Sequence, residues 1–363
     1  MGIKNLNNLL RKNCNHVFED IHLSEYAYKK IAIDVSLFLC KFKAIAGDRW
    51  LSSFINLVSS LRRNNIHCVF IYDNGAPTEK TSEKEERIRQ REKTETKVSE
   101  LEESLDEYYK TGEIDSKLVE LHDKIDKKKS SGRLLLNKQK AKIGIDMNLV
   151  KEQIEKMRNY IIKISPNDFE LTKSLFDILD IPYLVAPLEA ECMCSDLCKR
   201  GLVDGVLSED TDVLAYGSPV FLSKIDTKND TCVRVKYNDV LEALKLTKEQ
   251  FLDLCIMCGC DYNKNIPKVG CETSFKYISK YKTIDEIGRN LDIDISILNH
   301  KRTRELFTNY ERHNVKNIPY CGFPDVDKLK IFIKENNISL DFSKILKSFE
   351  NELVFIEDEE IEY

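Results

Sequence analysis

A short apolar strand that ends at an aspartate decides the fold class of this chain. Residues 29–36 read Lys-Lys-Ile-Ala-Ile-Asp-Val-Ser, so the strand runs directly into Asp34, and an apolar helical pattern follows. The same shape recurs twice, in apolar runs that end at Asp73 and near Asp210. Strands of this kind, alternating with helices, predict an α/β domain with a mainly parallel sheet.

The other predicted elements fit this fold class. The predicted strands are 29–34, 67–72, 181–186, 203–208 and 220–222. The predicted helices between them are 50–63, 168–179 and 187–200. We expect a twisted sheet flanked by helices, in which ligands bind beyond the carboxyl ends of the strands. The three aspartates stand at those ends, which is the first indication of a functional site.

The composition changes between residues 79 and 147, where charged residues of both signs dominate. Residues 100–123 carry a net charge of −7 and residues 124–142 a net charge of +7. Apolar residues in the acidic part are spaced as in a helical heptad, and Thr111-Gly112 interrupts them as a hairpin turn would. We predict an inserted helical hairpin whose tip is acidic and whose two ends, where it joins the rest of the chain, are basic. The alternative is a coiled coil whose charges only keep it soluble.

The chain after residue 240 is mostly helical, with an apolar helix that ends before Gly259-Cys260-Asp261. The predicted organisation has five parts, in which the α/β domain is interrupted by the charged insertion. These parts are 1–78 and 166–240 for the α/β domain, 79–165 for the insertion, 241–350 for a helical region, and 351–363 for an acidic tail.

The composition excludes several classes of protein. The 363 residues are 42% hydrophobic, enough to bury a core, and their net charge is −5. The sequence shows neither the apolar core of a signal peptide nor an apolar run long enough to cross a membrane. We therefore expect a soluble intracellular protein with reduced cysteines and no membrane partner. Taken alone, the negative charge argues against a nucleic-acid partner.

Seven acids stand where a predicted strand ends or a predicted helix begins or ends, and two pairs are spaced two residues apart. They are Asp34, Asp73, Glu189, Glu191, Asp210, Asp212 and Asp261. Each alone is commonly a turn former or a helix cap. Together they could not all stay ionised without cations, and oxygen ligands without His or Cys select Mg²⁺, for which Mn²⁺ can substitute. Two such ions about 3.5–4 Å apart activate water and stabilise the leaving oxygen of a phosphodiester.

The order of these motifs resembles the flap endonucleases of the XPG nuclease family, over roughly residues 1–350. The matching blocks are Met1-Gly2-Ile3, Ile33-Asp34-Val35-Ser36, Tyr72-Asp73-Asn74-Gly75-Ala76-Pro77, Ala186-Pro187-Leu188-Glu189-Ala190-Glu191, Ser208-Glu209-Asp210-Thr211-Asp212, Phe251-Leu252-Asp253-Leu254-Cys255 and Gly259-Cys260-Asp261-Tyr262.

The resemblance implies a fold, an activity and a cofactor. The fold is the PIN-like 5′ nuclease fold with an inserted helical arch and a C-terminal helix–two-turn–helix region that binds duplex DNA. The activity is a Mg²⁺-dependent, structure-specific 5′ flap endonuclease that acts on branched double-stranded DNA in replication and repair. All seven acids match metal-site positions: Asp34, Asp73, Glu189 and Glu191 mainly for one ion, and Asp210, Asp212 and Asp261 for the other. Asp210 is also the acid that we expect to be indispensable for cleavage.

The resemblance also assigns basic residues. Lys80 and Arg87 match the family's catalytic cations, and their spacing of seven puts them on one helix face, where they would neutralise the scissile phosphate. An ordinary solvated Lys or Arg is the alternative for each. Further DNA contacts would come from Lys84 and Arg91 on the arch, and from Lys268, Gly270 and Lys276 on the duplex-binding region.

Two departures from the family pattern stand out. The turn at 267–273 carries Lys268 in place of a glycine and Glu272-Thr273 in place of a basic pair, which affects the duplex contact and the K⁺ ion that the family holds there. Cys40 replaces an aromatic residue that stacks on a base, and Phe38 and Phe42 are the candidates to take over, although core packing is their commoner role. We find no sliding-clamp motif and expect a monomer.

Other interpretations stay open at this point. The chain could act as a 5′→3′ exonuclease or on four-way junctions, or it could be a DNA-binding or coiled-coil scaffold without activity. Cysteine spacings near residues 192–198 and 255–260 could suggest zinc, but the second group lies in an apolar helix, where cysteine is a common buried residue. The nucleus or a viral replication site is the expected location.

The net charge of −5 does not exclude a nucleic-acid partner once the acids are assigned. Seven of the 61 acids belong to the proposed metal site and five to residues 357–362 of the acidic tail. The remaining 49 acids face 56 Lys and Arg residues, which reverses the sign of the balance.

Overall fold

The computed structural model describes residues 2–131, 145–159, 161 and 163–350. The chain divides into two compact units, each described here by itself. The first, the sheet unit, comprises residues 1–42, 48–81 and 164–363 within the described ranges. The second, the helical unit, comprises residues 43–47 and 82–163 within the described ranges. Within the described part of the chain, no helix is long and apolar enough to cross a membrane.

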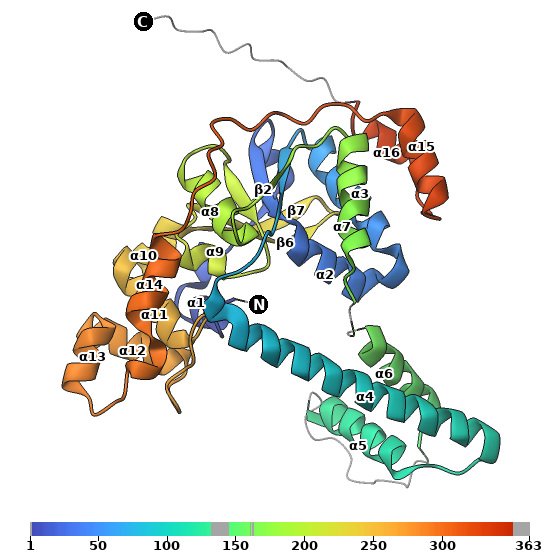
Figure 1. Ribbon diagram of the computed structural model, residues 1–363, viewed down its shortest axis with the longest axis horizontal. Helices are drawn as coiled ribbons and strands as arrows, with labels where there is room; N and C mark the ends of the chain where they lie inside the picture. The colour runs from blue at the N-terminus through green and yellow to red at the C-terminus, as the bar shows by residue number, and fades with distance from the viewer. Residues whose placement is uncertain (1, 132–144, 160, 162, 351–363) are drawn as a thin grey trace, which may run out of the picture. The chain divides into compact units, whose positions relative to one another are not determined.

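The sheet unit is built on a seven-stranded sheet in the order β1-β7-β6-β5-β2-β3-β4. Figure 1 labels three of these strands, β2, β6 and β7, among the surrounding helices. The strands are β1 (Glu19–His22), β2 (Lys30–Asp34), β3 (His67–Tyr72), β4 (Tyr183–Val185), β5 (Gly205–Leu207), β6 (Val220–Asp226) and β7 (Thr231–Lys236). The five from β6 to β4 pair in parallel, and β7 and β1 pair antiparallel at one edge. The predicted mainly parallel sheet is confirmed; β1 and β7 were not predicted.

Alternate residues of the central strands enter two hydrophobic cores, one on each face. In β2, Ala32 packs on the same side as α8 (Ala190–Lys199), while Ile31 and Ile33 pack with α3 (Trp50–Arg63) and α7 (Pro166–Ile178). The strand period of two explains this division, because successive side chains point to opposite faces. Both faces are covered, as in other parallel sheets.

Further helices complete the sheet unit. They are α1 (Leu6–Cys14), α9 (Asp212–Ala215), α10 (Tyr237–Leu244), α11 (Lys248–Cys258), α12 (Cys271–Tyr281), α13 (Ile284–Asn290), α14 (His300–Thr308), α15 (Val326–Glu335) and α16 (Phe342–Lys347), with α2 (Val35–Ala46) leading out of β2. Helices α11 and α12 and the turns between them lie where the helix–two-turn–helix was predicted. The predicted acidic tail, 351–363, lies outside the described residues.

The helical unit consists mainly of α4 (Thr81–Thr111), α5 (Ser116–Ser131) and α6 (Met147–Asn159). Its own core is formed by Val98, Leu101, Leu105, Leu118, Leu121, Val150 and Ile154. Helix α4 ends at the predicted turn, where Gly112 has a φ of +78° that favours glycine. The third helix, α6, was not predicted, and most of the basic zone at 124–142 falls on residues 132–144, outside the described ranges.

Candidate functional site

The carboxyl edge of the sheet gathers the acids that follow its strands. Asp34 is the last residue of β2, Asp73 follows β3, and Asp210 and Asp212 stand beyond β5 at the start of α9. Because β5, β2 and β3 are parallel neighbours, their carboxyl ends meet at one edge. Burial differs along this edge, since Asp34 is 5% exposed and Asp212 is fully buried, whereas Asp73 is exposed.

Two further elements bring the remaining acids to the same place. Glu189 and Glu191 flank the first residue of α8, and the backbone N–H of Ala190 donates to Asp73 Oδ1 at 2.7 Å, which fixes this helix start against β3. Asp261 follows α11, which ends at Cys258 and is capped by Gly259. A Cβ at Gly259 would lie 2.1 Å from Asn265 Oδ1, so the turn that presents Asp261 requires glycine.

Lys80 lies among these acids. It is the last residue of a short 3₁₀ turn at Thr78–Lys80, just before α4. Its Nζ is 2.5 Å from Glu189 Oε1, 3.1 Å from Asp261 Oδ2 and 3.5 Å from Glu191 Oε1. Burial lowers the pKa of Lys80, but the three surrounding carboxylates outweigh it and raise that pKa. Lys80 is therefore a fully charged, buried ammonium that neutralises part of the acidic charge.

The electrostatics of the other acids show that they share one space. Burial raises the pKa of Asp34, and the charges of Asp73, Glu191 and Asp210 raise it further. Burial also raises the pKa of Glu191 to about 8 although Lys80 opposes it. Burial and then Asp210 and Asp261 raise the pKa of Asp212. We call the seven acids named at the sequence level the carboxylate cluster, because the structure brings all of them together.

The carboxylate cluster fits a hard divalent cation. Both side-chain oxygens of Asp212 are buried without a hydrogen-bond partner among the described residues, so they offer lone pairs to a ligand. The donors are all carboxylate oxygens, which Mg²⁺ and Mn²⁺ prefer. Within the described ranges, however, no three His, Cys, Asp or Glu side chains already form a metal site. In this structure, Lys80 neutralises part of the negative charge of the carboxylate cluster.

Two tyrosines and a glycine complete the site, and the sequence analysis did not assign them. Tyr262 Oη donates to Glu189 Oε2, and Tyr216 Oη is 2.6 Å from Tyr262 Oη, so buried phenols orient the Glu189 carboxylate. Gly2 has a φ of +80°, and a Cβ there would lie 2.0 Å from Asp210 Oδ1. Gly2 and Tyr262 could have been found from the sequence, because they belong to the motifs Met1-Gly2-Ile3 and Gly259-Cys260-Asp261-Tyr262. Of these two motifs, only Asp261 was assigned a role.

The other predicted residues stand in different surroundings. Lys84, Arg87 and Arg91 belong to the helical unit, where Arg87 is paired with Glu83 on the exposed surface of α4. Lys268 is exposed with a φ of +64°, and Gly270 caps the start of α12, on which Lys276 is exposed. Of the stacking candidates on α2, Phe38 is fully buried in the core, where it cannot reach a base, and Phe42 packs edge-on against Phe54.

Comparison with known proteins bears on these positions. Residues 1–94 match the family model of the XPG N-terminal domain, and residues 180–261 match that of the XPG I-region. A probable RAD2-like endonuclease of Invertebrate iridescent virus 6 is 32% identical, covering 96% of this chain and 92% of that protein. Flap endonuclease 1 of Enterocytozoon bieneusi is 31% identical, covering 85% of this chain and 77% of that protein. The two family models together cover all seven acids, Gly2 and Lys80. Tyr262 lies one residue beyond the end of the XPG I-region match.

Solved structures share the fold. The catalytic core of Rad2 in complex with a DNA substrate has a TM-score of 0.64 and 17% identity, covering 94% of this chain and 97% of that one. Flap endonuclease-1 from Methanococcus jannaschii has a TM-score of 0.59 and 19% identity, covering 92% of this chain and 94% of that one. At these identities the likeness concerns the fold alone.

Proposed function

This chain belongs to the XPG family of structure-specific nucleases, and we propose that it is a 5′ flap endonuclease that hydrolyses phosphodiester bonds at branched DNA junctions with two bound Mg²⁺ ions. It is a DNA nuclease, and nucleases of this family depend on metal ions. The observation that carries the proposal is the carboxylate cluster around Lys80. Five of its seven acids are buried (Asp34, Glu189, Glu191, Asp210 and Asp212), and buried carboxylates at one sheet edge are costly to the fold unless cations neutralise them.

The acids divide between the two ions. Asp34, Asp73, Glu189 and Glu191 would mainly hold one, and Asp210, Asp212 and Asp261 the other. Bound Mg²⁺, for which Mn²⁺ can substitute, would supply an activated water and stabilise the leaving oxygen. Tyr262 donates to one oxygen of Glu189 and so orients this carboxylate.

Lys80 has a second role in this proposal. Bound divalent cations would neutralise Glu189, Glu191 and Asp261, and the ammonium of Lys80 would then be available to the scissile phosphate. A cation placed there stabilises the charge that develops in the transition state. Arg87 would add a second cation from α4, and Lys84 and Arg91 would contact DNA along the same helix.

The duplex next to the junction would lie on the turns between α11 and α12. Lys268, Gly270 and Lys276 would contact its phosphates, and K⁺ would bind at those turns as in the family. We propose a monomer that works where DNA replicates, in the nucleus or at a viral replication site; the similarity to a protein of an iridescent virus supports the second location.

A cleavage assay tests the proposed function. Labelled 5′-flap, nicked, blunt and four-way-junction DNA are incubated with the protein, with Mg²⁺ or with a chelator. A single Mg²⁺-dependent cut near the flap base is the expected result. Release of mononucleotides from nicks would instead identify an exonuclease, cutting of the four-way junction a resolvase, and no cleavage of any substrate a scaffold.

A matched pair of variants ties the activity to the carboxylate cluster. Asp210→Ala should abolish cleavage and leave DNA binding intact. The neighbouring Glu209→Gln is the control, because Glu209 is half-exposed and pairs with Lys41 at 2.7 Å and not with Lys80. Equal losses in both variants, or cleavage by Asp210→Ala, would contradict the metal assignment.

A further inference from the structure

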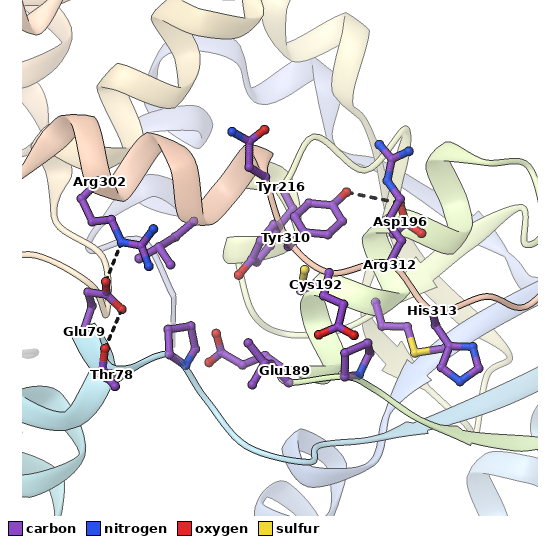
Figure 2. Close-up of a pocket in the computed structure, with 17 residues that line it drawn as sticks. Thr78, Glu79, Glu189, Cys192, Asp196, Tyr216, Arg302, Tyr310, Arg312 and His313 are labelled. Atoms are coloured by element: carbon purple, nitrogen blue, oxygen red, sulfur yellow. Dashed lines mark hydrogen bonds and ion pairs between the residues drawn. The ribbon is translucent and has the colours of Figure 1, made fainter.

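A segment between α14 and α15 has no helix or strand of its own and lies across the sheet unit. We call this segment, residues 310–325, the strap. Near its beginning it contacts α8, since Arg312 Nε is 3.4 Å from Asp196 Oδ1 (Figure 2). Near its end, Cys321 packs beside Cys68 at the start of β3. The strap therefore depends on side-chain contacts at two separate places.

Cys68 and Cys321 are in direct contact. The backbone N–H of Cys68 donates to Cys321 Sγ at 3.2 Å, and the same sulfur lies 3.3 Å from the carbonyl oxygen of Cys68. The two thiols also hydrogen-bond to each other. Both cysteines are free, and each is only 2% exposed. Two free thiols that the fold holds this close are candidates for a disulfide.

A buried arginine beside this pair has no carboxylate partner in the described part of the chain. Arg62 of α3 is 3% exposed, and its Nη1 donates to the carbonyl of Ile66 at 3.1 Å and lies 3.2 Å from His67 Nδ1. Its Nε has no hydrogen-bond partner among the described residues. The backbone N–H of Cys321 reaches the same His67 nitrogen at 3.1 Å. Because a buried charge without a counter-ion is costly, a neighbouring group that ionises to an anion stabilises Arg62.

The thiol of Cys321 is such a group. Burial opposes its ionisation, whereas hydrogen bonds with Cys68 and His67 favour it. The charge of Arg62 favours it as well, and together these contacts outweigh burial and lower the pKa of Cys321 to about 5. The pKa of Cys68 is raised instead, because its thiol hydrogen-bonds to Cys321 and is buried. At neutral pH the pair therefore consists of one thiolate and one thiol, the two partners that disulfide formation needs.

The strap also gives small molecules access to this pair. Among the described residues, its backbone N–H groups donate to backbone carbonyls at only two places, from Gly322 and from Asp325. Tyr320, the residue before Cys321, is 60% exposed. A segment with so few backbone hydrogen bonds opens at a lower free energy than the strands beneath it. Local opening of the strap therefore exposes the Cys321 sulfur while the sheet stays folded.

We propose that Cys68 and Cys321 are an oxidation site, at which a peroxide produces a reversible disulfide that ties the strap to β3. The Cys321 thiolate attacks hydrogen peroxide, the O–O bond breaks, and a sulfenic acid and a hydroxide ion form. The Cys68 sulfur then attacks the Cys321 sulfur, the S–O bond breaks, and the Cys68 proton leaves with the hydroxyl group as water. Two electrons pass from the two sulfurs to one peroxide. Because the disulfide deprives Arg62 of its anion, added thiols should reduce it readily.

Peptide mapping tests the pair directly. The full chain is reduced, freed of reductant, treated with hydrogen peroxide at pH 7 (about neutral) and digested without reduction for mass spectrometry. The expected product is a cross-linked peptide that joins Cys68 to Cys321 and disappears when dithiothreitol is added. Its absence, or a cross-link between other cysteines in its place, would overturn the inference. The result does not depend on the proposed nuclease activity, because no DNA takes part.

Variants identify the attacking sulfur. In Cys68→Ser, oxidation should stop at a sulfenic acid on Cys321, which the reagent dimedone labels, whereas no label on Cys321 would overturn its role. Arg62→Met should slow cross-linking about tenfold, because the thiolate loses its counter-ion; an unchanged rate would contradict the thiolate assignment. Where Arg62→Met does not fold, as circular dichroism shows, the Cys68→Ser result decides. The matched control is Cys232→Ser, which should cross-link like the wild type. Cys232 is also 2% exposed, but burial raises the pKa of its thiol to about 12.

Hydrogen exchange tests the consequence for the strap. In the oxidised protein, the amides of residues 320–325 should exchange about tenfold more slowly than in the reduced protein, because the cross-link restricts local opening. Cys321→Ser should show no difference between the two conditions. Equal exchange in oxidised and reduced wild-type protein would show that the disulfide does not hold the strap, and would overturn that part of the inference.

Discussion

The carboxylate cluster of the sheet unit and the acids of the helical unit have the same chemistry in opposite surroundings. In the cluster, burial and like charges raise the pKa of Asp34 and of Asp212. In the helical unit, the acids lie on the surface and pair locally, as Glu100 does with Lys117 at 3.1 Å and Glu120 with Lys124 at 3.5 Å. Exposed pairs of this kind contribute little to stability, at most about 1 kcal/mol.

This difference teaches that the number of acids says less about function than their burial does. A surface acid is solvated, so its charge can vary without consequence for the fold. A buried acid without a counter-ion lowers stability, and Lys80 neutralises only part of the charge of the five buried acids in the carboxylate cluster, so this arrangement needs a compensating function. The predictions that follow change one charge at a time in the two settings.

The largest effect is expected for Asp212→Asn. Cleavage should fall by about 10³-fold or more, because a ligand of the second proposed ion loses its charge. The free energy of unfolding without metal should rise by about 1–3 kcal/mol, because a buried carboxylate without partners is removed. Chemical denaturation in chelator and single-turnover cleavage in Mg²⁺ measure the two changes.

Its control lies in the helical unit. Glu107→Gln removes an exposed acid and should leave both quantities unchanged within about 0.5 kcal/mol and twofold in rate. If Asp212→Asn proved less stable than the wild-type protein in chelator, the comparison between buried and exposed acids would fail.

Lys80→Met should have the next largest effect. Without metal, the loss of the ammonium leaves Glu189, Glu191 and Asp261 uncompensated, and breaking a buried ion pair in this way costs about 3–5 kcal/mol. Added Mg²⁺ should recover much of that loss but not the cleavage rate. Urea denaturation with and without Mg²⁺ measures the recovery.

The matched change in the helical unit is Arg89→Met, at an exposed residue that lies 3.9 Å from Glu86. It should alter stability by no more than about 0.5 kcal/mol, with or without Mg²⁺. An equal deficit of Lys80→Met in chelator and in Mg²⁺ would show that the ammonium does not substitute for metal charge.

A smaller effect is expected for Lys268→Gly, which tests an exposed charge that we propose serves DNA rather than the fold. Its φ of +64° lies in the left-handed region, which costs a non-glycine residue about 1 kcal/mol. Glycine should therefore stabilise the protein by less than about 1 kcal/mol, since its greater freedom in the unfolded chain offsets part of the gain. Salt-dependent DNA binding should lose about one unit of slope, and an unchanged slope would remove Lys268 from the duplex contact.

The smallest effect concerns Asp115 at the start of α5. A hydrogen bond from the backbone N–H of Lys117 and then one from Ser104 lower the pKa of Asp115 below its ordinary 3.8. A lowered acid pKa contributes stability that is present above the unfolded value and is lost as the pH falls through the folded value. Asp115→Asn should therefore lower the melting temperature slightly at pH 7 and not at pH 2. A difference that grew towards low pH would reverse this sign.

The parts of the molecule that could be predicted from sequence are those with local signals. The strands that end at Asp34 and Asp73 are short apolar runs followed by turns, and parallel pairing alone brings such ends together. Helix α7 also carries its own start signal, because Ser165 and Asp168 cap it reciprocally. The structure of these segments is determined by residues that lie within a few positions of one another in the chain.

The missed parts depend on distant residues. Strand β1 buries only Ile21 and pairs with β7, where Ile21 lies opposite Cys232, so no short-range pattern could indicate it. The pairing of Lys80 with Glu189 and Asp261 likewise joins three separate elements. Sequence patterns place such residues near a site but give no information about which charges will touch.

The pairing of β3 with β4 has a consequence for how the family can vary. Phe70 and Tyr183 are parallel neighbours in the sheet, although residues 82–163 of the helical unit are inserted between them in the chain. The entropy of closing a long loop grows only with the logarithm of its length, by about 0.6 kcal/mol for each doubling. Evolution can therefore lengthen, shorten or recharge this insertion at almost no thermodynamic penalty to the sheet, so new substrates and partners can be acquired there while the buried acids stay where they are.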